Sequence, residues 1–242
     1  MSRPPRPLLP DAHYHVTARG NRKANIFLDD RDYLIWLDFV ARTADRFGFI
    51  CHAYCQMPNH FHLLLETPLP NLSDGMHFLN CLYSQSFNFR HGLTGHVFQG
   101  RYHSVLLEEE SHFLELARYI TLNPVRAGLV NEAADWRWSS YRATAGLISA
   151  PEWLDTSTIR ERFNGTDDVD RIRAYCNFVA AGIGGRDPMK SPALPAFDGK
   201  QDRQHAIAAA LRAGHHTPAQ IAEHFKVSTK TVQRIRAAEA AR

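Results

Sequence analysis

Two histidines, at positions 60 and 62, stand at the head of the apolar run MPNHFHLLLE. Neutral imidazole is a common ligand of divalent metals. In a strand, successive side chains point to opposite faces, so His60 and His62 share one face. Phe61, Leu63 and Leu65 share the other face and would anchor the strand in a core. The pair has two interpretations: it holds a metal ion, or it consists of surface or core-edge histidines without a ligand.

A second chemical pattern lies in the segment SHFLELARYITLNPVRAG. Tyr119 and Asn123 are four residues apart, which places them one turn apart on the same side of a helix. A tyrosine at the edge of an apolar helix face is usually a core residue with its hydroxyl at the rim. Beside a metal-polarised phosphate, a phenol is also a nucleophile for covalent catalysis. The amide oxygen of Asn123 is then a candidate third metal ligand.

The segment FQGRYHSVLLE places a cation and an aromatic ring together just before an expected strand. Arg101 and Tyr102 suit a phosphate backbone and an unstacked base, as in proteins that bind single-stranded nucleic acid. The alternative is an ordinary solvated loop.

The elements that must position these residues follow from hydrophobic periodicity and turn residues. Strands are expected at 14–19, 49–56, 60–67 and 104–108. Helices are expected at 30–47, from Asn71 or Ser73 onward, and from Ser111 to a stop at Asn123-Pro124. Further helices are expected at 136–145 and 157–181. This order predicts an α+β fold in which helices pack against an antiparallel sheet.

The C-terminal part differs from the rest in charge. Residues 203–242 contain seven lysines and arginines against two glutamates, a net +5, whereas the whole chain has a net charge of only +3. The segment TPAQIAEHFKVSTKTVQRIRAAEA predicts a helix-turn-helix-like unit, with Thr217 as the first cap and Val227-Ser228 in the turn. Its expected buried side chains are Ile221, Ala222, Phe225, Val232 and Ile235. Its expected DNA contacts are Thr229, Lys230, Gln233 and Arg234. The alternative is a generic packed helical hairpin.

Composition narrows the function classes. No apolar run approaches the roughly 18 residues that a membrane span needs. The N-terminal MSRPPRPLLP lacks the apolar segment of a secretory signal. The four cysteines form no C-x-x-C pair, so we expect free thiols in a reducing cytoplasm. We therefore expect a cytoplasmic protein that binds nucleic acid and no membrane.

These patterns occur together in a known order. The segments YHVTARGNRKANIF, YCQMPNHFHLLLE, GRYHSVLLEEE, LARYITLNPVRAGLV and WRWSSYRA resemble the HUH endonucleases, specifically the REP-associated tyrosine transposases. The resemblance covers residues 13 to about 145. It implies a ferredoxin-like antiparallel sheet for a catalytic domain at 13–150. An N-terminal tail (1–12), a helical extension (151–183), a linker (184–202) and the C-terminal unit (203–242) complete the expected organisation.

Carried over by position, the resemblance implies a role for each matching residue. His60 and His62 become metal ligands, Asn123 the third polar ligand and Tyr119 the catalytic nucleophile, with Mg²⁺ or Mn²⁺ as the ion. DNA contacts are assigned to Arg19, Asn21, Arg101, Tyr102 and Arg126 in this domain. The expected partner is single-stranded or hairpin DNA, with double-stranded DNA as a further partner of the C-terminal unit. The resemblance is compatible with a monomer or a homodimer.

The resemblance thus implies a metal-dependent single-stranded DNA transesterase that cleaves near REP-type hairpins through a 5′-phosphotyrosine. Two alternatives from other classes remain. A domesticated regulator would bind hairpins without turnover, and a metal hydrolase would release free ends without a covalent product.

Overall fold

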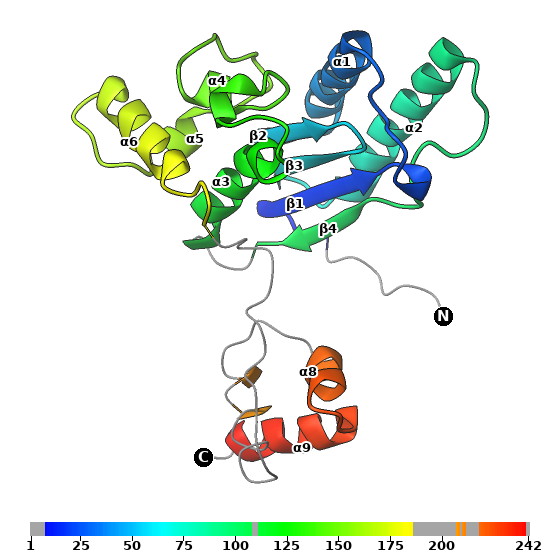
Figure 1. Cartoon of the computed structure of the whole chain (residues 1–242), viewed down its shortest axis with the longest axis vertical. Helices are drawn as coiled ribbons and strands as arrows, with labels where there is room; N and C mark the ends of the chain where they lie inside the picture. Colours follow the sequence, from blue (N-terminus) through cyan, green and yellow to red (C-terminus); the bar gives the residue numbers. More distant parts are fainter. Residues whose placement is uncertain (1–7, 108–110, 186–206, 209, 212–217, 241–242) are drawn as a thin grey trace. The chain divides into compact units, whose positions relative to one another are not determined.

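The structure, a computed structural model, describes residues 8–107, 111–185, 207–208, 210–211 and 218–240 (Figure 1). The chain divides into two compact units, with the boundary between residues 187 and 188. The expected linker at 184–202 lies almost entirely outside the described residues, as does the expected helix cap Thr217. Within the described parts of the chain, no helix is both long and apolar enough to cross a bilayer.

The first unit is built on a four-stranded antiparallel sheet with the strand order β2-β3-β1-β4. The strands are β1 (Ala12–Arg19), β2 (Ile50–Met57), β3 (His60–Thr67) and β4 (His103–Leu106). The helices between them give the chain order strand, helix, two strands, helix, strand, helix. This is the ferredoxin-like arrangement, and it confirms the predicted α+β fold class.

One face of the sheet is covered by α1 (Asp30–Phe47) and α2 (Leu72–His91) (Figure 1). Trp36, Phe61 and Met76, all fully buried, belong to the core between these helices and the sheet. The helix α1 begins at the cap Asp29, whose side chain accepts from the backbone N–H of Asp32. It ends at Gly48, which takes the left-handed conformation with φ of 70°. The bounds expected for this helix are confirmed.

The other face carries α3 (Ser111–Arg126), with a second core that includes Leu64, Phe113 and Ile120. The helix α6 (Asp168–Ala180) packs against the same core. The prediction that Asn123-Pro124 stops α3 is wrong, because the helix includes Pro124 and ends at Arg126. Gly128, with φ of 68°, ends it by letting the backbone N–H of Leu129 bond to Pro124 O at 3.0 Å.

The segments expected to be helical at 136–145 and 157–181 are helical only in part. The helices in these segments are α4 (Tyr141–Thr144), α5 (Ser157–Arg160) and α6. A short 3-10 turn, η2 (Ala133–Asp135), precedes the first segment. Backbone hydrogen bonds to β2 explain the first difference. Gln56 N–H donates to Trp138 O and Ser140 N–H to Tyr54 O, both at 2.9 Å. Pairing with the edge strand thus replaces the helical bonds of this segment.

The second unit contains α8 (Pro218–His224) and α9 (Thr229–Ala240). Ile221, Phe225 and Val232 are buried between them, as the sequence predicts. The turn uses Lys226 where glycine is frequent. Lys226 has φ of 52°, and the bonds Lys226 N to Glu223 O and Val227 N to Ala222 O close a Schellman motif.

Candidate active site and metal centre

The two histidines of the HFH motif lie on the sheet face that α3 covers. His62 is buried and His60 partly buried, and their ring centroids are 5.0 Å apart. Phe61, Leu63 and Leu65 belong to the core on the opposite face. The ring of Tyr119, on α3, meets the His62 ring edge-on at 5.6 Å between centroids. The fold therefore brings together the two imidazoles and the phenol that the sequence singled out.

Asn59 determines which nitrogen of His60 carries the proton. His60 Nδ1 lies 2.6 Å from Asn59 Oδ1, and Asn59 Nδ2 donates to Lys23 O at 3.1 Å. Because the carbonyl of Lys23 accepts only, the carboxamide of Asn59 must present its oxygen to His60. His60 therefore donates from Nδ1, and in the neutral ring its Nε2 keeps the lone pair that a metal ion needs.

His15 acts in the same way on His62. His15 Nε2 and His62 Nδ1 are 2.9 Å apart, and the two rings are nearly parallel, with 9° between their planes. His62 Nε2 is buried and has no hydrogen-bond partner among the described residues. Burying a polar nitrogen without a hydrogen bond costs free energy, and a bound ligand would offset this cost at His62 Nε2. A metal ion at Nε2 fits the site and requires His62 to donate from Nδ1 to His15.

Burial keeps these imidazoles neutral. It lowers the pKa of His60 to about 4, with the charge of Arg19 as a second cause. It also lowers the pKa of His15 to about 4, with His103 adding to the effect. The pKa of His62 falls well below its ordinary value, first through burial and then through His15, His60 and Arg19. Near neutral pH all three rings can therefore offer a lone pair.

The helix α3 holds Tyr119 against an arginine. Arg126 lies over the Tyr119 ring at 5.2 Å and also donates to Tyr119 O at 3.3 Å. Asn123 Nδ2 donates to the same carbonyl at 2.9 Å, which leaves Oδ1 as the atom suited to a metal ion. The structure shows this contact of Asn123 within its own helix, and its role as third ligand stays a prediction. So does the DNA-contact role of Arg126.

The other predicted DNA contacts are spread over two regions of the first unit. Arg19 and Asn21 are exposed at the end of β1 and in the 3-10 turn η1 (Asn21–Lys23). Arg101 is exposed, but Tyr102 is buried and its hydroxyl lies 3.1 Å from Ser73 Oγ. Both line a cavity of ≈ 610 Å³ between α2 and the loop before β4.

In the second unit the predicted DNA contacts all lie on the solvent side of α9. Thr229, Lys230, Gln233 and Arg234 are exposed. They follow a helix cap in which Ser228 Oγ accepts from Thr231 N–H at 3.1 Å. Their exposure suits a contact with DNA, and that role stays a prediction.

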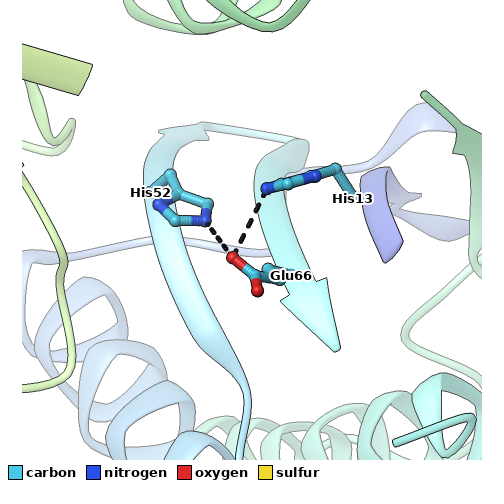
Figure 2. A group of neighbouring side chains, drawn as sticks. All are labelled: His13, His52 and Glu66. Atoms are coloured by element: carbon cyan, nitrogen blue, oxygen red, sulfur yellow. Dashed lines mark hydrogen bonds and ion pairs between the residues drawn. The ribbon is translucent and has the colours of Figure 1, made fainter. Parts of the chain in front are cut away.

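A separate group of ligand-type side chains could hold a metal ion. His13, His52 and Glu66 each offer one ligand atom, and these atoms lie within 4.8 Å of one another. Figure 2 shows both rings directed at the same carboxylate oxygen of Glu66. The distances to this oxygen are 3.1 Å from His52 Nε2 and 3.4 Å from His13 Nε2.

Sequence reasoning missed several of these residues, and only some had a local signal. His13 and His15 form a second His-x-His pair, HYH, with the spacing of the HFH pair; it lies on β1, which begins two residues before the strand expected at 14–19. Asn59 directly precedes His60. His52 had no such signal, since its approach to Glu66 depends on the pairing of two strands.

A profile of the family described as "Transposase IS200 like" matches residues 9–123. This segment belongs to the IS200-like transposase family. This IS200-like segment begins at Leu9 and ends at Asn123. It includes the HFH pair and Tyr119. The family resemblance expected from the sequence is thereby confirmed.

One curated protein and one solved structure are similar to this chain over a longer stretch. A curated protein of Haemophilus influenzae, provisionally named a REP-associated tyrosine transposase, is 24% identical over 145 residues, which are 52% of this chain and 82% of the relative. A solved structure of a REP-associated tyrosine transposase bound to a REP hairpin is 21% identical. It superposes with a TM-score of 0.52 over 65% of this chain and 96% of its own. At this identity the likeness shows the shared fold of the IS200-like segment.

Proposed function

We propose that the chain is a metal-dependent single-stranded DNA transesterase that cleaves near hairpins and uses Tyr119 as its nucleophile. One observation supports this function above the others. The Tyr119 ring lies against His62, whose Nε2 is buried without a hydrogen-bond partner among the described residues. If His62 served only to pack against α3, there would be no reason to bury its Nε2 without a hydrogen-bond partner.

The residues present suit a divalent ion of the Mg²⁺ or Mn²⁺ kind. His60 Nε2, His62 Nε2 and Asn123 Oδ1 would hold it. When bound, the ion supplies positive charge to the scissile phosphate and offsets the negative charge that grows in the transition state. Each ligand histidine must offer a lone pair to the ion. His60 and His62, both neutral, can each do so from Nε2.

The chain's own residues would then carry the reaction. The Tyr119 oxygen attacks the phosphorus and loses its proton as the new phosphorus–oxygen bond forms. The bond between phosphorus and the 3′ oxygen breaks, and that oxygen leaves as a 3′-hydroxyl after taking up a proton. The product is a 5′-phosphotyrosine, which a second 3′-hydroxyl can attack to join strands. Because Arg126 lies over the Tyr119 ring, its charge favours the developing phenolate.

Arg19 would position the phosphate. It pairs with His60 in the register of β1 and β3, and its charge acts on both His60 and His62. An exposed guanidinium beside the metal ligands can bind a phosphate oxygen in a bidentate manner. The preference for hairpins rests on the relative whose solved structure holds a REP hairpin. The exposed face of α9 would add contacts to double-stranded DNA.

The decisive experiment is an adduct assay. The full chain is incubated with a labelled single-stranded hairpin oligonucleotide and Mg²⁺ or Mn²⁺, and the products are separated on a denaturing gel. We expect a protein–DNA adduct that is lost in Tyr119→Phe and kept in Tyr141→Phe, a matched change of a partly buried tyrosine. An adduct that survives Tyr119→Phe contradicts the nucleophile. Cleavage without any adduct favours a hydrolase, and binding alone favours a regulator.

A further inference from the structure

His13, His52 and Glu66 are too far from the HFH pair to share its ion. Glu66 follows His62 by four residues on β3, a separation of roughly 13 Å at about 3.3 Å per residue. Bonds from a metal ion to imidazole nitrogen are only about 2.0–2.1 Å long. Any ion held by Glu66 is therefore a second ion, on the same face of the sheet.

A bulge in β2 creates this group. The pairing of β2 with β3 shifts by one residue between Cys51 and Ala53. Cys51 packs in the core under α1 and α2, and Ala53 packs in the core under α3. The extra residue, His52, turns to the α3 face, where it meets Glu66. If alternation continued from Ala53 without the bulge, His52 would point to the α1 and α2 face, so the bulge places His52 and Ala53 on the same face.

The distances already approach those of a coordination sphere. Ligands at about 2.0–2.1 Å from a tetrahedral ion lie roughly 3.3 Å from one another. His52 Nε2 and His13 Nε2 lie 3.1 and 3.4 Å from Glu66 Oε2. The remaining separation, between the two imidazoles, is within 4.8 Å and closes with a small rotation of the partly exposed His13 ring.

On its far side His52 faces the carboxylate of Asp155 at ion-pair distance, although its buried Nδ1 makes no hydrogen bond among the described residues. His52 Nδ1 lies 3.1 Å from Asp155 Oδ2, and Asp155 is itself held by Ser157 N–H and Thr158 Oγ1. A neutral imidazole has one N–H, so between two carboxylates it must direct one lone pair at a negative oxygen. A cation on Nε2 removes this conflict and produces a carboxylate–histidine–metal arrangement.

We propose that His13 Nε2, His52 Nε2 and the Glu66 carboxylate bind a structural ion of the Zn²⁺ class. Two imidazoles and one carboxylate are a ligand set that Zn²⁺ accepts. The ion would tie three neighbouring strands together at the end of the sheet away from Tyr119. Phe113 packs against both rings, with its centroid 5.1 Å from each, and water from the solvent side would complete the coordination.

The test begins with the variant His60→Ala/His62→Ala, which removes the first metal site. This full-length protein is freed of metal with a chelator and titrated with Zn²⁺ by calorimetry. We expect one equivalent to bind and the midpoint of thermal unfolding, Tm, to rise with Zn²⁺. Adding Glu66→Gln or His13→Gln should weaken Zn²⁺ binding at least tenfold and abolish the rise in Tm. Asp155→Asn should weaken binding by about 10- to 100-fold.

A control excludes adventitious binding. His77 and Cys81 lie one turn apart on α2, with Sγ 3.6 Å from Nε2, and such a pair can bind Zn²⁺ by itself. His77→Ala should therefore leave the proposed site unchanged. Visible absorption of bound Co²⁺ reports imidazole ligation directly and should disappear with His52→Gln. Zn²⁺ binding and Tm shifts that are the same with and without Glu66→Gln and His13→Gln would overturn the proposal. The proposal does not depend on DNA cleavage, so the adduct assay and this titration can fail independently.

Discussion

Neighbouring residues influence which ring nitrogen of His60 and of His62 carries the proton. Asn59 and His15 each contact the Nδ1 side of a proposed ligand histidine, at 2.6 and 2.9 Å. They leave both Nε2 atoms for a metal ion. The partners of ligand histidines influence metal affinity almost as strongly as the ligands themselves. Asn59 and His15 are therefore positioning residues, and their effects should appear in metal binding before they appear in stability.

Asn59→Leu removes the acceptor that keeps the His60 proton on Nδ1. We expect the affinity for Mn²⁺ to fall by about 10- to 100-fold because part of the neutral His60 then carries its proton on Nε2. Electron paramagnetic resonance of free Mn²⁺ measures the affinity, and ¹⁵N chemical shifts of His60 report the tautomer. The control Asn59→Asp keeps an acceptor oxygen and should keep the Nδ1 proton. Unchanged ¹⁵N shifts in Asn59→Leu would contradict the role of Asn59.

The buried histidines also make stability depend on pH. His15 and His60 have native pKa values of about 4, below the value of about 6.5 in an unfolded chain. The unfolded state therefore binds more protons between these values, and the unfolding free energy of the metal-free protein falls as pH drops from about 6.5 to about 4. The loss approaches roughly 3 kcal/mol per histidine.

Urea unfolding at several pH values measures this dependence. His15→Gln should flatten the slope between about pH 6.5 and about pH 4, since one of the histidines with a lowered pKa is gone. His96→Gln, a change at an exposed position, should leave it unaltered. Equal slopes in the wild type and His15→Gln would refute the assignment.

Local patterns determine some elements and fail for others. The helix at 30–47 and the strand at 60–67 were predicted with their observed bounds, because caps, glycine and alternation are properties of neighbouring residues. The segment at 136–145 was not, since its backbone bonds go to β2. The bulge at His52 was equally invisible, because it exists only where two strands pair. Tyr119 and the HFH pair were identified from the sequence. Asn59 and His15, which contact the two histidines, were not.

At the scale of elements, Pro124 and Lys226 both depart from the residue usually found at their position. Pro124 lies inside α3, and it has no N–H to donate to the preceding turn. Lys226 stands where the Schellman motif favours glycine. A helix end can accept such residues when the neighbouring backbone groups find other partners, as the bonds of Leu129 and Val227 show.

Lys226→Gly should stabilise the second unit. The left-handed conformation costs a residue with a side chain about 1–2 kcal/mol, whereas glycine loses roughly 0.5–1 kcal/mol more backbone entropy on folding. The difference favours glycine by about 0.5–1 kcal/mol. Amide hydrogen exchange of Phe225 and Val227 in the full chain measures it. Lys230→Gly, the same exchange inside α9, should instead speed exchange, and slower exchange in both variants would contradict the account.

At the scale of the whole molecule, one chain supplies every residue of the proposed active site. Tyr119 and His62 meet within a single copy of the fold. A site completed in this way does not require a dimer, although it does not prevent one.

Mixing inactive variants tests this arrangement. Tyr119→Phe chains and His60→Ala/His62→Ala chains, combined before addition of hairpin DNA, should form no more adduct than either does alone. Each chain lacks one half of its own site and cannot obtain it from the other. The wild type diluted with either variant provides the control and should retain activity in proportion to its amount. Restored adduct in the mixture of variants would show that the site forms between two chains.

The strand β1 has one further consequence. It carries His13 and His15 on the same face, so it links the proposed zinc group to the partner of His62. The supply of zinc would then control how much of the chain is folded in a cell, and the supply of magnesium would control how fast the folded part reacts. A chelator removes both ions at once. Only adding each ion back separately can show whether lost activity reflects an empty catalytic site or a loosened sheet.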